Sequence, residues 1–283
     1  MTLSSQIEPS NAAGTRSAAL RRSYLRRVAM GVTITAIYAF LLFPILIIVF
    51  SSFNPTTANT FPPEGFSLRW YWAFLESRPF TSAFRFSVWL GVVAATISTL
   101  IGFITAYGIV RFLGRWRETG QTLAMLPIMV PQILISISLL ILLTVVPIPE
   151  LAGLIIGHVI ICLPFTIAGI LASLDGVDRQ IELAAWTLGA SRVRILWEIV
   201  IPLVAPGLVS ALIFSFIISF GDVYIALFLS GPGMTTLPIE IFSYMLWEST
   251  PVVAAITTVQ ILMILLLGLI IERLVGLRAI MRI

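Results

Sequence analysis

Asp222 is an acidic residue inside a long apolar stretch of this sequence, and its neighbours along one helical face are small and polar. Ser215 and Ser219 precede it at helical spacing, and Ala226 follows it. Because an ionised carboxylate in hydrocarbon is costly, this face should line a cavity or meet a partner charge. We therefore predict that it lines a path for a polar solute, with helix packing through small residues as the alternative. Aromatic side chains that could stack on the solute or bind a cation, or simply form core, follow an adjoining stripe: Phe216, Phe220 and Tyr224.

His158 and Cys162 lie one helical turn apart in another apolar stretch, at a spacing that metal ligands use. Two ligands do not make a site, and the sequence has 1 histidine and 1 cysteine, so no metal site is predicted. A hydrogen bond from His158 to a neighbouring helix is the preferred interpretation, and a role as proton carrier is the alternative. Cys162 is predicted to be a small core residue.

A charged amphipathic segment interrupts the apolar stretches in the second half of the chain. Residues 183–188 are predicted to form one helical segment and residues 192–201 a second, with Gly189 supplying a break where φ > 0 carries no penalty. Apolar residues recur at helical spacing on the second segment: Val193, Leu196, Trp197 and Val200. The segment is suited to binding a soluble partner, and a helix lying among lipid headgroups is the alternative.

The composition places these residues in a membrane. Of the 283 residues, 59% are hydrophobic and 11% are charged, and the mean hydropathy of +1.05 excludes a soluble domain. Six apolar runs are long enough to cross about 30 Å of hydrocarbon as helices. They cover residues 28–50, 86–110, 123–146, 151–171, 206–229 and 252–274. The predicted fold class is an all-α integral membrane protein with six transmembrane helices.

All 17 basic residues are arginines, and their distribution predicts the topology by the positive-inside rule. Arg69, Arg78 and Arg85 fall on one side of the predicted spans, and the other 14 fall on the opposite side. Both termini are therefore predicted to be cytoplasmic. The predicted parts are a poorly ordered tail at 1–27, a transmembrane domain at 28–275 with a cytoplasmic loop at 172–201, and a cytoplasmic end at 276–283. The arginines should contact membrane lipid, whereas their spread over short loops argues against nucleic-acid binding.

Motifs for ATP binding and for hydrolysis within the membrane are missing. The sequence contains no lysine and hence no G-x-x-x-x-G-K-[ST] loop, and it has no G-x-S-x-G or H-E-x-x-H segment. We therefore predict that the chain is not an enzyme and holds no cofactor of its own. Any ATP must be hydrolysed by another chain.

The spacing of Ala184 and Ala185 before Gly189, and of Ile199 and Pro202 after it, resembles the cytoplasmic loop of ABC importer permeases. In that family two short helices around the glycine dock into a cleft of the ATPase. The resemblance implies a coupling helix here and favours ATPase docking over a helix among headgroups. The residues that it assigns to coupling are Glu182, Ala184, Ala185, Gly189, Ala190, Ser191, Arg192 and Pro202.

One position departs from the family pattern. The family has a glutamate six residues before the glycine, where this sequence has Leu183, and Glu182 lies one residue earlier. Either Glu182 reaches the same partner from the neighbouring position, or packing replaces that polar contact.

Other stretches resemble the second permease subunit of polyamine (spermidine/putrescine) importers. They include Tyr38-Ala39-Phe40, residues 158–165 and residues 215–223, and the similarity covers about residues 36–275. In the polyamine type two adjacent aspartates often occupy the positions of Gly221 and Asp222. Since one of them is missing here, monoamines and zwitterionic amino acids are also candidate solutes, and similar permeases carry opines, phosphonates or ferric ion.

The resemblance implies a type I ABC importer permease fold and transport by alternating access in a bacterial inner membrane. The implied partners are a homologous second permease, two ATPase subunits that bind ATP and magnesium, and an external solute-binding protein. A stand-alone secondary transporter in which Asp222 and His158 relay protons is the alternative, although the inverted repeats often seen in such transporters are not apparent. A membrane scaffold without transport would not explain the buried acid.

Overall fold

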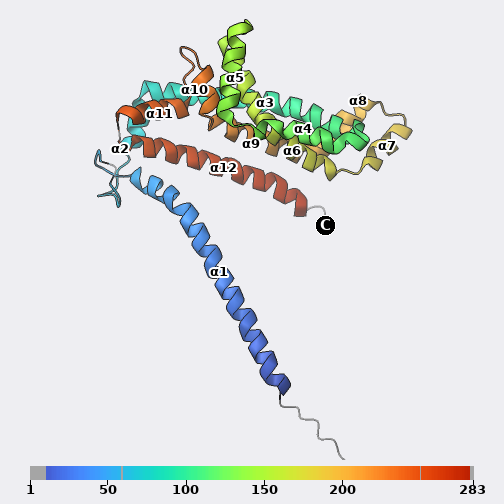
Figure 1. Cartoon of the computed structure of the whole chain (residues 1–283), viewed down its shortest axis with the longest axis horizontal. Helices are drawn as coiled ribbons and strands as arrows, with labels where there is room; N and C mark the ends of the chain where they lie inside the picture. The colour runs from blue at the N-terminus through green and yellow to red at the C-terminus, as the bar shows by residue number, and fades with distance from the viewer. Residues whose placement is uncertain (1–10, 59, 249, 281–283) are drawn as a thin grey trace, which may run out of the picture.

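Figure 1 shows the computed structural model, which describes residues 11–58, 60–248 and 250–280. Within these residues the chain is helical and forms no strand, in agreement with the predicted all-α class. The helices are α1 (Asn11–Ser51), α2 (Arg69–Glu76), α3 (Arg78–Phe112), α4 (Arg117–Met129), α5 (Gln132–Val145), α6 (Glu150–Asp175), α7 (Arg179–Thr187), α8 (Arg192–Ile195), α9 (Ile201–Phe220), α10 (Tyr224–Leu229), α11 (Leu237–Trp247) and α12 (Val252–Ile280). A 3₁₀ turn, η1 (Gly114–Trp116), precedes α4, and a π-helical segment, η2 (Leu196–Val200), joins α8 to α9.

Three long helices, α3, α6 and α9, pack side by side and form the core of the bundle (Figure 1). Glycines on α3 allow the close approach. A Cβ at Gly102 would lie 2.7 Å from Oγ1 of Thr166 on α6, and a Cβ at Gly91 would lie 2.9 Å from the ring of Phe216 on α9. Larger residues at these positions would therefore push the three helices apart.

Five helical stretches of the described residues are long and apolar enough to cross a membrane. They are Tyr24–Ser51, Arg78–Phe112, Glu150–Asp175, Arg192–Phe220 and Val252–Arg273. The first, second, fourth and sixth predicted spans are confirmed. The third and fifth differ from the prediction.

The predicted span at 123–146 is not one helix. α4 ends at Met129 and α5 begins at Gln132, and the two are bent by 88°. Pro131 has no N–H to continue the helix, and it disfavours the helical conformation at Val130, which is extended with ψ of 129°. The sequence predicted one helical span here, whereas the structure has two helices, and these make a sixth span only if the bent pair is counted as one.

The predicted span at 206–229 is interrupted as well. α9 ends at Phe220, and α10 begins after a short non-helical segment. Gly221 is a poor helix former, and the Asp222 carboxylate accepts a hydrogen bond from the N–H of Ala226 (3.1 Å). Asp222 therefore lies in a break between α9 and α10, and the prediction that it lies on one continuous helical face was wrong.

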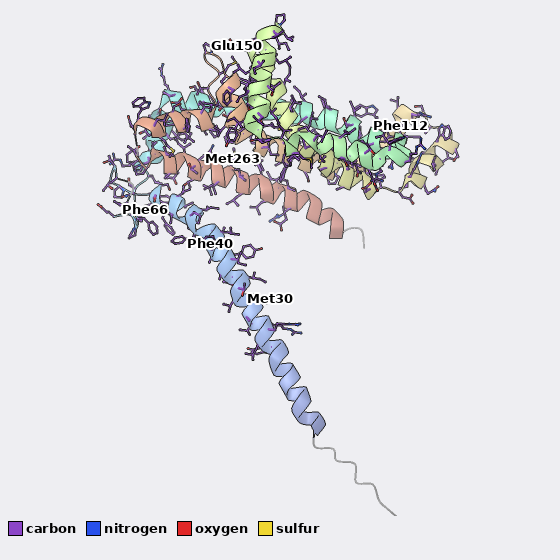
Figure 2. The ribbon with its side chains drawn as sticks, viewed as in Figure 1. Met30, Phe40, Phe66, Phe112, Glu150 and Met263 are labelled. Atoms are coloured by element: carbon purple, nitrogen blue, oxygen red, sulfur yellow. The ribbon has the colours of Figure 1, made fainter. Side chains whose placement is uncertain are left out.

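α1 stands clear of the bundle for most of its length (Figure 1) and contacts α12. Met30 and Phe40 are 60% and 79% exposed, and Figure 2 shows them on the free part of this helix. The helix begins at Asn11, so much of the tail predicted at 1–27 continues the first span, while residues 1–10 lie outside the described residues. At the other terminus α12 extends to Ile280.

The two ends of the bundle carry different segments. α7, α8 and the turn between α3 and α4 lie at one end, and α2 and α11 lie at the other (Figure 1). Arginines of the predicted cytoplasmic group belong to the first set of elements: Arg111, Arg115, Arg117, Arg179, Arg192 and Arg194. The topology prediction therefore makes the α7–α8 end cytoplasmic.

Reporter fusions test this topology and the number of crossings together. Because 14 of the 17 arginines fall on one side of six spans, reporters fused after Arg27 and Arg282 should both be cytoplasmic. A reporter inserted near Pro62 should be external. Paired alkaline phosphatase and fluorescent protein fusions give the measurement. An external C-terminal reporter would mean that the bent α4–α5 pair does not cross the membrane.

Candidate coupling loop and substrate path

The turn at Gly189 ends α7 in a fully hydrogen-bonded form. Gly189 has φ of 90°, in the left-handed region. Its N–H donates to the carbonyl of Trp186 (3.0 Å), and the N–H of Ala190 donates to the carbonyl of Ala185 (3.1 Å), which together form a Schellman motif. The predicted break at Gly189 is confirmed, and any side chain at this position would be strained.

Side chains cap both helices that meet at this turn. Asp178 accepts a hydrogen bond from the N–H of Gln180 (2.9 Å) at the start of α7. Ser191 accepts one from the N–H of Arg194 (3.3 Å) at the start of α8 and so fixes the direction in which the chain leaves the turn. Since α8 continues through η2 into α9, the turn is attached directly to a membrane-spanning helix.

Large apolar side chains are exposed around this turn. They are Leu183, Trp186, Leu188, Val193 and Trp197, of which Leu188 is 89% exposed. The predicted apolar stripe of α8 is therefore divided, because Val193 and Trp197 face outward whereas Val200 is buried. Phe112, which Figure 2 shows at this end of the bundle, lines a hollow of about 190 Å³ together with Trp186. An exposed apolar patch of this kind marks a site of interaction with another molecule.

Some of the remaining predicted coupling residues lie on the surface, and others pack against the core. Ala184 and Arg192 are exposed, and Ala185 and Ala190 are half-buried against the end of the core that lies near α7 and α8. Pro202 lies in the first turn of α9, directly after η2. Proline cannot donate a hydrogen bond to the preceding turn and its ring crowds that turn, so the wider π-helical turn accommodates it.

Glu182 lies on the wall of the same hollow and is largely buried there. Nη2 of Arg111 lies 2.5 Å from Oε1 of Glu182, and the two side chains are 9% and 11% exposed. The hydroxyl of Tyr107 donates to the other carboxylate oxygen of Glu182 (3.1 Å). Both partners belong to the C-terminal end of α3, and neither was predicted from the sequence. Glu182 is therefore bound by its own chain in this structure.

His158 on α6 connects to the break between α9 and α10. Its Nδ1 lies 2.8 Å from Oγ of Ser219, and its Nε2 lies 3.9 Å from Oδ2 of Asp222. The two ionisable side chains are 0% and 1% exposed. The predicted hydrogen bond from His158 to a neighbouring helix is confirmed. Within the described part of the chain, Nε2 of His158 and Oδ1 of Asp222 have no hydrogen-bond partner, so the cluster keeps unused bonding capacity.

The other residues predicted to line the path are mostly packed inside the chain. Ser215 is buried, and its carbonyl accepts a hydrogen bond from Sγ of Cys162 (3.3 Å), which is a core residue as predicted. The rings of Phe216 and Phe220 stack at 5.6 Å, whereas Tyr224 is 45% exposed. Among the described residues no three His, Cys, Asp or Glu side chains gather in a way that could hold a metal ion. The substrate-path role of this face stays a prediction.

Comparison with known proteins identifies the family. The family described as "Binding-protein-dependent transport system inner membrane component" matches residues 98–278. The chain belongs to this family. The spermidine/putrescine transport system permease protein PotC of Haemophilus influenzae is 36% identical to this permease, over 88% of this chain and 95% of that protein. The putrescine transport system permease protein PotI of Escherichia coli is 33% identical, over 78% of this chain and 81% of that protein.

Solved structures show the same fold. A crystal structure of a bacterial ABC transporter involved in the import of the acidic polysaccharide alginate matches with a TM-score of 0.68 at 16% identity, over 89% of this permease and 97% of that chain. The predicted type I ABC importer permease fold is confirmed. The chain is a multi-pass permease of a bacterial inner membrane transport system, and the stand-alone transporter is not favoured.

Proposed function

We propose that this permease carries a polyamine or a related small amine across the inner membrane as one subunit of an ATP-driven importer. The exposed apolar surface around Gly189 carries the proposal, because it is suited to docking a soluble ATPase. The relatives named for spermidine and putrescine support the solute class.

The proposed complex contains a second, homologous permease, two ATPase subunits that bind ATP and magnesium, and an external solute-binding protein. In this proposal the permease itself binds no cofactor. Closure of the ATPases would displace α7 and α8, and the displacement would pass through η2 into α9 because these elements are continuous. The break at Asp222 would then open toward the outside to accept solute, with the helical bundle as the two-state element.

The solute is proposed to carry fewer positive charges than spermidine. Gly221 stands beside Asp222, so this position of the chain offers one carboxylate where two would bind a polyamine more strongly. A thermal-shift screen of the associated binding protein should include putrescine, spermidine, a monoamine and an aminophosphonate. Stabilisation by the aminophosphonate alone would overturn the proposed solute class.

Co-isolation tests the proposed complex. We expect the tagged permease, solubilised in detergent, to bring down a second permease and about twice as much ATPase subunit. Vesicles that contain the purified complex should take up solute only with ATP inside and binding protein outside. Uptake by this chain alone, driven by a proton gradient, would instead support the proton-relay transporter built on Asp222 and His158.

A further inference from the structure

The helix α7 has few attachments to the rest of the chain. It packs mainly against α8, whereas α3 packs along α6 and α9 over much of its length. Within α7, all of whose residues are described, Glu182 is the one buried residue. Its partners Arg111 and Tyr107 lie at the C-terminal end of α3. The principal polar connection between α7 and the core of the bundle therefore runs through Glu182.

Burial distinguishes this ion pair from others at the same end. Arg117 pairs with Asp175 and Arg194 pairs with Glu198, and in both pairs each side chain is more than a third exposed. Exposed pairs contribute little because water screens them. The stability of a buried pair such as Arg111 and Glu182 requires both charges, because removal of either one leaves the other uncompensated and away from water.

We propose that Arg111 and Glu182 form the link through which a displacement of α7 reaches α3 and, through α3, the packed helices α6 and α9. Glu182 is then a positioning residue that faces its own chain, and it does not contact the ATPase. The inference rests on the proposed docking of an ATPase at α7 and α8. It also decides the alternative that the sequence left open: Glu182 does not take the place of the family's glutamate at the ATPase but contacts Arg111 inside the permease.

The test uses the whole complex in vesicles with putrescine-loaded binding protein. Glu182→Gln and Arg111→Gln each remove one charge and keep much of the side-chain volume. We expect co-isolation of the ATPase to be unchanged, while putrescine uptake per ATP hydrolysed falls at least tenfold. Loss of the ATPase from the Glu182→Gln complex would overturn the proposal, because it would place Glu182 in the docking contact.

Charge reversal separates a link between two residues from a structural role of each. The double variant Arg111→Glu with Glu182→Arg should recover uptake per ATP to within about threefold of the parent, because the pair re-forms in the opposite sense. The matched control is the exposed pair, where Arg117→Gln and Asp175→Asn should change the ratio by less than twofold. The proposal is overturned if the double variant is no better than the single ones, or if the single variants behave like the control.

If the single variants do not accumulate in the membrane, a second double variant can test the proposed link. Arg111→Met with Glu182→Leu removes both charges together, which proteins tolerate well at buried pairs, so the complex should assemble. We expect it to hydrolyse ATP with little putrescine uptake. Normal coupling in this variant would overturn the proposal. Failure of the parent chain to co-isolate any ATPase would instead contradict the proposed function, and leave the Arg111–Glu182 contact as a purely structural one.

Discussion

Gly189→Leu is expected to abolish coupling, with solute uptake falling at least tenfold. At φ of 90° an L-residue costs about 1–2 kcal/mol, and relief of this strain would break the hydrogen bonds that close the turn. The new direction of α7 would carry its exposed apolar residues away from the docking partner. ATPase co-isolation and uptake per ATP, measured on the purified complex, report the effect.

Gly268→Leu is the matched control for this variant. Gly268 lies in the long helix α12, without the left-handed φ of Gly189, and at both positions an added Cβ meets no atom within 4 Å. Since space is available at both sites, a difference between the variants isolates backbone strain. Uptake by Gly268→Leu should stay within about twofold of the parent. Normal uptake by the Gly189→Leu complex would show that the turn does not set the docking geometry.

Asp222→Asn is expected to lower uptake of a cationic solute at least tenfold with the yield of complex unchanged. Asparagine keeps the size of the side chain and can still accept the hydrogen bond from Ala226 that caps α10. It removes the negative charge, so a charge-assisted contact with the solute is lost, and tenfold corresponds to about 1.4 kcal/mol. Uptake of labelled putrescine by vesicles that contain the complex gives the measurement.

Asp178→Asn is the corresponding control, because Asp178 caps α7 through its side chain from an exposed position. We expect its uptake to remain within about twofold of the parent. Asp222→Ala removes the cap as well as the charge and should lower the yield. Unchanged uptake by Asp222→Asn would exclude a solute-binding carboxylate, and a collapse in its yield would make Asp222 a structural partner of His158.

Local properties of the chain were predictable from the sequence. Hydropathy over about 20 residues places the spans, because each must match the thickness of the hydrocarbon layer. The break at Gly189 was predictable because the absence of a Cβ acts within a single residue. The interruption at Asp222 was missed, although glycine followed by an aspartate is a recognised sign that one helix ends and another begins nearby.

Contacts between distant segments were not predictable. Tyr107 and Glu182 are separated by 75 positions, and no local pattern relates them. The arginines at the end of α3 appeared only as topological markers, because the positive-inside rule treats all of them alike. The Arg111 side chain is 9% exposed and that of Arg117 is 37% exposed, a difference that depends on which acidic side chain each one meets in the folded chain.

The 88° bend between α4 and α5 constrains what can surround this permease in the bilayer. α4 has 13 residues and is therefore about 20 Å long, so a helix of this length that starts at one face of the bilayer ends before it reaches the other face. At the start of α5 the carbonyl of Pro131 accepts hydrogen bonds from the N–H groups of Leu134 and Ile135 (2.9 and 3.3 Å). The carbonyls that end α4 lose their usual helical donors at the bend, and lipid tails cannot replace these donors. A hollow of about 340 Å³ lies at this bend, between Pro131 and Phe165. We therefore expect water or a neighbouring protein, and not lipid tails alone, to meet the exposed backbone at this bend.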